Sequence, residues 1–130
     1  MKKLCVLIVD DQEDMLDLLA LVLKGAGFSS ATAVDGKHAL KLLRELRPEV
    51  IITDLMMPDI SGIDLIKIVR STPDLAEIPI LAMSADSTGL LPEAEKAGAT
   101  KALKKPIDFD RLLKWLRDLI PFPAPVSSPT

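Results

Sequence analysis

Residues 50–62 read VIITDLMMPDISG, and this stretch decides the fold. Its first four residues are apolar or β-branched, as is typical of a strand buried on both faces of a parallel sheet. The strand ends at Asp54, and a loop with Pro58 and Gly62 follows it. Apolar residues then recur at helical spacing, at Ile63, Leu65, Ile66 and Val69. The stretch therefore predicts a strand, a loop and a helix, with a carboxylate where the strand ends.

The same alternation recurs along the rest of the chain. Further strands are predicted at Leu4–Val9, Ser29–Val34, Ile80–Met83 and Lys101–Lys104. Helical stripes are predicted at Met15, Leu18, Leu19, Val22 and Leu23; at Ala39, Leu42, Leu43 and Leu46; at Leu90–Ala97; and from Phe109 to Ile120, after Asp108 as N-cap. Because parallel strands need crossover connections, strand then helix five times over indicates an α/β fold, doubly wound, with helices on both faces of a parallel sheet.

The composition bounds the class of protein. The chain has 130 residues, 48% of them hydrophobic, which suits one domain with a real core. A net charge of −3 with interspersed charges differs from the basic stripe of a nucleic-acid binder. The single cysteine, Cys5, excludes an intramolecular disulfide. The apolar start stops at Asp10-Asp11, no stretch is long enough to span a bilayer, and a cytoplasmic protein without membrane contact is expected.

The last ten residues differ from everything before them. Residues 121–130 read PFPAPVSSPT, and four prolines rule out a helix there. We therefore expect one domain over residues 1–120 and a Pro-rich tail or linker over 121–130. A disordered end and a linker to a further domain remain open alternatives.

Polar side chains stand where the predicted strands end. They are Asp10-Asp11, Asp54, Ser84 and Lys105, and strand ends of a parallel sheet share one rim, where ligands bind. Three carboxylates in one pocket repel one another, and a hard cation such as Mg²⁺ removes that conflict. A lysine and a hydroxyl can hold phosphate oxygens, and a carboxylate can act as nucleophile. The set predicts phosphoryl transfer.

The motifs resemble those of the receiver domains of two-component response regulators, including the chemotaxis response regulators. The matching residues are Val-Asp-Asp at 9–11, Asp-Leu-Met-Met-Pro-Asp-Ile-Ser-Gly at 54–62, Met-Ser-Ala at 83–85 and Lys-Lys-Pro at 104–106. The resemblance covers residues 3 to 120. It implies a flavodoxin-like (βα)5 fold with five parallel strands in the order 2-1-3-4-5.

The resemblance also implies a set of metal ligands. Asp54 would be the phosphoacceptor. Asp11, Asp54 and the backbone carbonyl of Met56 would bind Mg²⁺ directly, and Asp10 would act through water.

Other residues would hold the phosphoryl group or shape the site. Ser84 would hydrogen-bond the phosphoryl group, and Lys105 would pair with its oxygens. The Lys105–Pro106 bond would be cis. Pro58 and Gly62 would be structural, with Gly62 allowing the turn that starts the third helix.

One departure from the family concerns the relay of the signal. Many receivers carry Tyr or Phe three residues before the active-site lysine, where this chain has Ala102. We therefore expect a readout without a ring flip, through the face of the fourth helix, fifth strand and fifth helix, where Trp115 is either packing or a partner-binding anchor.

The resemblance implies partners as well as a site. A histidine kinase or a histidine phosphotransfer protein would supply the phosphoryl group. An output domain beyond the tail and a homodimer through the readout face are open. The protein would be a regulatory domain that catalyses only its own phosphotransfer and dephosphorylation, and it would contact no nucleic acid itself.

Other classes of function are weighed against this one. Haloacid dehalogenases also use a nucleophilic aspartate, but they need a second acid where this chain has Met56. A flavin or nucleotide module needs a phosphate loop after the first strand, where this chain has the acidic stretch Asp10-Asp11-Gln12-Glu13-Asp14, which would repel an anion. A receiver-like scaffold that is never phosphorylated stays open. Asp10-Asp11 could also simply cap the following helix.

Overall fold

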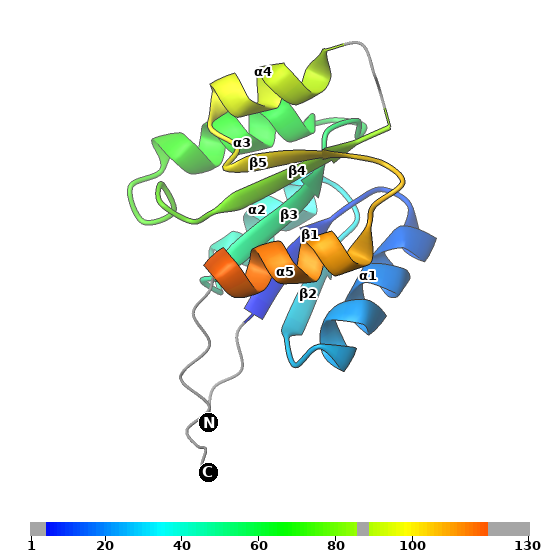
Figure 1. Cartoon of the computed structure of the whole chain (residues 1–130). Coiled ribbons are helices and arrows are strands. Elements are labelled where there is room, and N and C mark those ends of the chain that lie inside the picture. Colours follow the sequence, from blue (N-terminus) through cyan, green and yellow to red (C-terminus); the bar gives the residue numbers. More distant parts are fainter. Residues whose placement is uncertain (1–4, 86–88, 120–130) are drawn as a thin grey trace.

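The computed structural model describes residues 5–85 and 89–119. Five strands alternate with five helices (Figure 1). The strands are β1 (Cys5–Val9), β2 (Ser29–Ala33), β3 (Val50–Asp54), β4 (Ile80–Ser84) and β5 (Lys101–Lys104). The helices are α1 (Glu13–Gly25), α2 (Gly36–Leu43), α3 (Gly62–Ser71), α4 (Leu90–Ala97) and α5 (Phe109–Leu119). The predicted boundary after residue 120 and the Pro-rich tail lie outside the described residues.

All strands are parallel and form one sheet in the order β2-β1-β3-β4-β5. The predicted fold class and strand order are confirmed. The register pairs Val9 with Thr53, and Asp54 with Met83. The carboxyl ends of β1, β3 and β4 therefore meet at one edge of the sheet, with the central strand β3 between the other two.

Helices cover both faces of the sheet (Figure 1). On one face α1 and α5 pack on alternate strand residues, including Ile8, Ile52 and Leu81. On the other face α2, α3 and α4 pack on the residues between these, including Leu7 and Ile51. Because β1, β3 and β4 are covered on both sides, their sequences are continuous apolar runs rather than alternating ones. No helix in the described part of the chain is both long enough and apolar enough to cross a lipid bilayer.

The predicted apolar stripe of α1 was partly wrong. The buried residues are Leu16, Leu19 and Leu23, whereas Leu18 is 43% exposed. α1 is rich in leucine, so several stripes fit a period of 3.6 residues, and contact with the sheet selects one of them. In α2, the last residue of the predicted stripe, Leu46, lies beyond the helix end at Leu43.

An arginine that the sequence did not single out ties three segments together. The guanidinium of Arg70, near the end of α3, donates to the carbonyl of Gly98 at 2.8 Å. It also donates to the carbonyls of Ala76 at 2.9 Å and Ile78 at 2.6 Å, between α3 and β4. Burial lowers the pKa of this guanidinium. Arg70 thereby fixes the C-terminal end of α4 against the start of β4.

Replacing Arg70 by lysine is expected to lower the free energy of unfolding by about 2 kcal/mol. A single ammonium group cannot reproduce the planar fork that reaches these carbonyls. Urea denaturation measures the loss. The control is Arg44→Lys, because Arg44 is exposed and its side chain has no partner among residues 5–85 and 89–119; a change within about 0.5 kcal/mol is expected there. Equal losses for both variants would contradict the role of Arg70.

Candidate functional site

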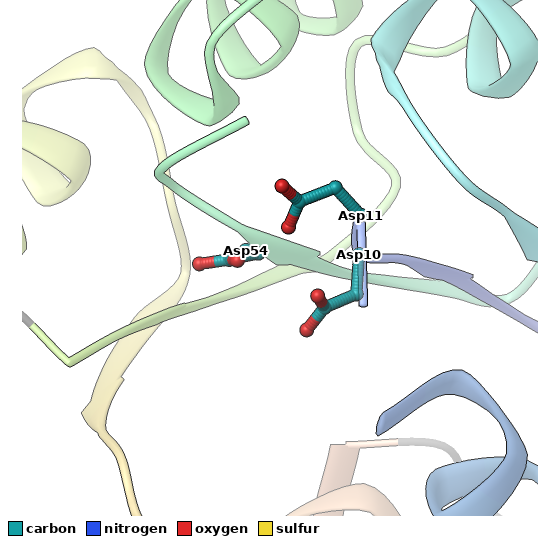
Figure 2. A group of neighbouring side chains, drawn as sticks. All are labelled: Asp10, Asp11 and Asp54. Carbon is teal, nitrogen blue, oxygen red and sulfur yellow. The ribbon is translucent and has the colours of Figure 1, made fainter. Parts of the chain in front are cut away.

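Three carboxylates from two neighbouring strands gather at the rim (Figure 2). Asp10 and Asp11 directly follow β1, and Asp54 is the last residue of β3. One oxygen of each carboxylate lies within 4.8 Å of the others. Asp10 is fully buried, Asp54 is 6% exposed, and Asp11 is exposed. The sequence prediction that these acids meet in space is confirmed.

Backbone hydrogen bonds fix the two buried acids. The amide of Asp10 donates to the carbonyl of Ala33 at 3.1 Å, and its carboxylate accepts from the amide of Gln12 at 2.9 Å. The amide of Leu55 donates to the carbonyl of Met83 at 2.9 Å, which holds the chain just after Asp54. Neither acid is the N-cap of α1, since that residue is Gln12, which makes no side-chain cap. Simple helix capping by Asp10 or Asp11 is therefore wrong.

Lys105 reaches this group from the far end of the sequence. Its ammonium lies 3.1 Å from Oδ2 of Asp10 and 3.5 Å from Oδ2 of Asp54. Its amide donates to the carbonyl of Ser84 at 2.9 Å, and the bond to Pro106 is cis, as predicted. The cation and the two buried acids thus form one charged cluster.

One lysine does not balance three carboxylates. Burial raises the pKa of the Asp54 carboxyl, Lys105 lowers it, and the charge of Asp10 raises it again. Carboxylate oxygens are the ligands that Mg²⁺ prefers, and a divalent cation would relieve the remaining repulsion. The donor set of Asp10, Asp11 and Asp54 fits a hard divalent cation.

The other predicted residues lie around this cluster or away from it. Ser84 ends β4 and is fully buried, next to the strand that carries Asp54. Met56 is 59% exposed, and its amide lies 3.4 Å from Oδ1 of Asp54. Pro58 is exposed in the loop between β3 and α3. Ala102 and Trp115, both half-buried, lie in the middle of β5 and in α5, away from the carboxylates.

Gly62 is needed for a reason other than the one expected. It begins α3 without a positive φ, so the turn itself does not require glycine. A Cβ there would lie 2.3 Å from the carbonyl oxygen of Asp54 and 2.6 Å from Cα of Leu55. The start of α3 therefore lies in direct contact with the backbone of Asp54, the candidate phosphoacceptor.

Thr53 was missed by the sequence analysis. It is fully buried, and its hydroxyl donates to the carbonyl of Asp54 at 2.9 Å. The only feature of the sequence that could have indicated this contact is a polar residue near the end of an otherwise apolar strand.

Asp54→Asn is expected to raise the Tm of the metal-free protein at neutral pH. Because the folded state raises the pKa of Asp54, it binds more protons than the unfolded chain between the two pKa values. The charged carboxylate therefore costs stability above this window, and the cost disappears as pH falls below the ordinary carboxyl pKa. Thermal unfolding in EDTA, from about pH 4 to pH 8, measures this gain. A gain that grows at acid pH would contradict it.

Mg²⁺ provides the matching experiment on the intact cluster. At a hundredfold excess over its Kd, Mg²⁺ should raise the free energy of unfolding of the unmodified chain by about 2.7 kcal/mol. The same Mg²⁺ concentration should stabilise Asp54→Asn less, because one anionic ligand is gone. Equal stabilisation of both chains would place the ion elsewhere.

Comparison with known proteins agrees with this geometry. The family model of the response regulator receiver domain matches residues 6–117. The DNA-binding response regulator MtrA of Mycobacterium tuberculosis is 34% identical over 114 residues, 86% of this chain and 48% of MtrA. The response regulator MprA of a Mycobacterium species is 34% identical over 125 residues, 95% of this chain and 54% of MprA. The chain thus spans about half the length of these curated relatives.

Solved structures agree as well. Chemotaxis protein CheY4 of Vibrio cholerae superposes with a TM-score of 0.84 at 33% identity, covering 92% of this chain and all of CheY4. The receiver domain of a signal transduction histidine kinase from Syntrophus aciditrophicus gives a TM-score of 0.84 at 25% identity, covering 97% of this chain and 96% of that one. The family matched is that of a regulatory domain. This chain belongs to the receiver domains of two-component response regulators.

Proposed function

We propose that this chain is a phosphorylation-dependent switch that accepts a phosphoryl group on Asp54 from a histidine kinase or a histidine phosphotransfer protein. The observation that carries the proposal is the charged cluster itself. The Asp54 carboxylate lies 3.5 Å from the Lys105 ammonium, and it has an oxygen within 4.8 Å of oxygens of Asp10 and Asp11. A nucleophile that lies close to both a cation and a metal-binding acid pair is the equipment of phosphoryl transfer.

Each residue has a definite task in the proposed reaction. A carboxylate oxygen of Asp54 forms a bond to phosphorus while the donor's P–N bond breaks, and the electron pair stays on the donor nitrogen. Lys105 pairs with the phosphoryl oxygens, and the Ser84 hydroxyl donates to one of them.

The cluster also supplies a metal site. Asp11, Asp54 and the Met56 carbonyl would hold Mg²⁺, with Asp10 acting through water. When bound, Mg²⁺ neutralises negative charge on the transferred group. Pro58 and Pro106 would be structural residues of the loops that follow β3 and β5.

The switch would be read through α4, β5 and α5. Ser84 ends β4 and Lys105 directly follows β5, so the two residues that would hold the phosphoryl group stand at the ends of neighbouring strands. Ala102 offers no ring to turn inward. The change of this face on phosphorylation would therefore come from α4 and the segment before it. A change from mostly off to almost fully on needs about 5.5 kcal/mol of preference for one state.

The curated relatives are about twice as long as this chain. MtrA is named a DNA-binding response regulator, and this chain covers about half of it. We propose that residues 1–120 are the receiver domain and that residues 121–130 link it to an output domain. A homodimer through α4, β5 and α5 is a second way of using the same face. A histidine kinase or phosphotransfer partner would place the chain in the cytoplasm.

Intact-mass spectrometry tests the proposal. The chain is incubated with phosphoramidate, with Mg²⁺ or with EDTA, and Asp54→Asn is treated in parallel. One phosphoryl group should be gained only by the unmodified chain with Mg²⁺. The control variant is Asp64→Asn, an exposed acid at the start of α3, which should label normally. Labelling of the Asp54→Asn variant, or no labelling of the unmodified chain with Mg²⁺, would contradict the proposal.

A further inference from the structure

One hydroxyl group lies inside an apolar layer of the sheet, directly before the candidate phosphoacceptor. Thr53, next to last in β3, is fully buried. Its partners across the sheet are Val9 on β1 and Ala82 on β4, and both belong to the core that α2, α3 and α4 cover. Valine has nearly the same shape and no polar atom, and a buried hydroxyl costs stability unless it is hydrogen-bonded. Packing alone therefore does not account for threonine at this position.

The Thr53 hydroxyl is bonded to the backbone of Asp54. It donates to the Asp54 carbonyl at 2.9 Å. The pairing of β1 with β3 ends at Val9 and Thr53, so this carbonyl lies one residue beyond the last registered pair. The amide of the next residue, Leu55, donates to the carbonyl of Met83 at 2.9 Å. The peptide unit that joins Asp54 to Leu55 is therefore held at both of its polar atoms.

The start of α3 restricts the same peptide unit. A Cβ at Gly62 would lie 2.3 Å from the carbonyl oxygen of Asp54, and the amide of Gly62 donates to the carbonyl of Leu55 at 3.0 Å. A buried carbonyl that loses its donor is costly, so without the Thr53 hydroxyl the peptide unit is expected to rotate toward another donor. The hydroxyl thus fixes one orientation of this peptide unit.

The chain just beyond this peptide unit carries backbone atoms of the site. The amide of Met56 lies 3.4 Å from Oδ1 of Asp54, and the Met56 carbonyl is one of the proposed Mg²⁺ ligands. Rotation of the unit between Asp54 and Leu55 changes the backbone angles on both sides of it and displaces Met56 relative to the Asp54 carboxylate. Residues that orient metal ligands without touching the metal have large effects on metal affinity.

We infer that Thr53 is a positioning residue: its hydroxyl holds the peptide unit after Asp54 and thereby places the Met56 backbone against the Asp54 carboxylate for Mg²⁺ binding and phosphoryl transfer. Thr53 acts through the Asp54 carbonyl, so it is not itself a catalytic residue. The part of the inference that concerns phosphoryl transfer rests on the proposed function, whereas the part that concerns Mg²⁺ affinity does not require a phosphodonor.

Three variants of the chain isolate the hydroxyl. Thr53→Val removes it and keeps a side chain that suits a buried strand, whereas Thr53→Ser keeps the hydroxyl and loses the methyl group. The matched control is Thr100→Val. The Thr100 hydroxyl accepts the amide of Ile80 at 3.1 Å, where β4 begins, at the opposite end of the sheet from Asp54. Urea denaturation identifies conditions in which every variant is fully folded, and all comparisons are made there.

Mg²⁺ affinity is measured without any phosphodonor. Isotope-labelled methionine gives the Met56 amide a signal in a heteronuclear NMR spectrum, identified by its loss in Met56→Leu. The shift of this signal on titration with Mg²⁺ gives the Kd. The Kd should rise about tenfold in Thr53→Val and stay within about twofold in Thr53→Ser and Thr100→Val. A general loss of stability would not distinguish Thr53→Val from Thr100→Val in this way.

Phosphoramidate labelling at saturating Mg²⁺, followed by intact mass, measures the second effect. The rate should fall about tenfold in Thr53→Val, the factor that corresponds to one lost hydrogen bond, and recover in Thr53→Ser. An unchanged Mg²⁺ Kd in Thr53→Val would overturn the inference, and so would equal losses of affinity in Thr53→Ser or Thr100→Val. Absence of labelling in the unmodified chain would count against the proposed function, while the Mg²⁺ affinities would still decide the role of Thr53.

Discussion

The free energy of unfolding is expected to fall by about 3 kcal/mol when Gly62 is replaced by alanine, near the upper end for overpacking. The added Cβ would lie 2.3 Å from the carbonyl oxygen of Asp54 and 2.6 Å from Cα of Leu55. Both neighbours are backbone atoms of the central strand and the residue after it, so neither can rotate away. Either α3 or the end of β3 must move.

The same substitution should also disturb the site. The amide of Gly62 donates to the carbonyl of Leu55 at 3.0 Å, so the start of α3 and the chain after Asp54 move as one unit. A displacement there shifts the candidate phosphoacceptor relative to Lys105, and small misplacements of reacting groups cost large factors in rate. Labelling by phosphoramidate should therefore slow in the variant even at temperatures where it remains folded.

Gly25→Ala is the matched control. Gly25 ends α1 with no heavy atom within 4 Å of the added Cβ and without a positive φ. Alanine there should be neutral or stabilise the chain by up to about 1 kcal/mol, by reducing the entropy of the unfolded state. Urea denaturation of both variants gives the comparison. A Gly62→Ala variant as stable as Gly25→Ala would mean that the close approach to Asp54 is absent.

The site was predictable because parallel sheets have a simple rule. Strands that run in one direction end at one rim, so residues at strand ends meet whatever their separation in sequence. Asp10, Asp54 and Lys105 are far apart in the chain. The Lys105 ammonium nevertheless lies within ion-pairing distance of both carboxylates. Short apolar runs located the strand ends to within one residue, and that precision was sufficient.

Interactions made by the backbone left no such signal. The partners of Arg70 are carbonyl oxygens, which every residue possesses, so no residue type marks them in the sequence. The close approach of Gly62 to Asp54 likewise depends on where α3 lies on the sheet. In α1, leucines on several sides fit one period equally well, and tertiary packing chose Leu16 over Leu18. The roles of individual site residues in phosphorylation remain predictions.

Lys105→Met is expected to cost about 3 kcal/mol of stability in metal-free buffer at neutral pH, since removing one partner of a buried ion pair leaves the other uncompensated. The ammonium side chain is 14% exposed, and Asp10, its nearer partner at 3.1 Å, is fully buried. Loss of the cation also removes the influence that lowers the pKa of Asp54. Saturating Mg²⁺ should recover part of the lost stability, because it supplies positive charge to the same carboxylates.

The neighbouring residue Lys104 provides the matched control for this prediction. Lys104 is exposed and pairs with no acid among the described residues, so Lys104→Met should change stability by no more than about 0.5 kcal/mol. Phosphoramidate labelling should slow by about a hundredfold in Lys105→Met, the usual cost of losing one group that stabilises transition-state charge, and hardly at all in Lys104→Met. Both variants lose one positive charge, at adjacent residues. Equal effects on stability and labelling would mean that Lys105 acts only through its net charge and not through its contacts. A difference confined to Lys105 would assign the effect to its contacts with Asp10 and Asp54.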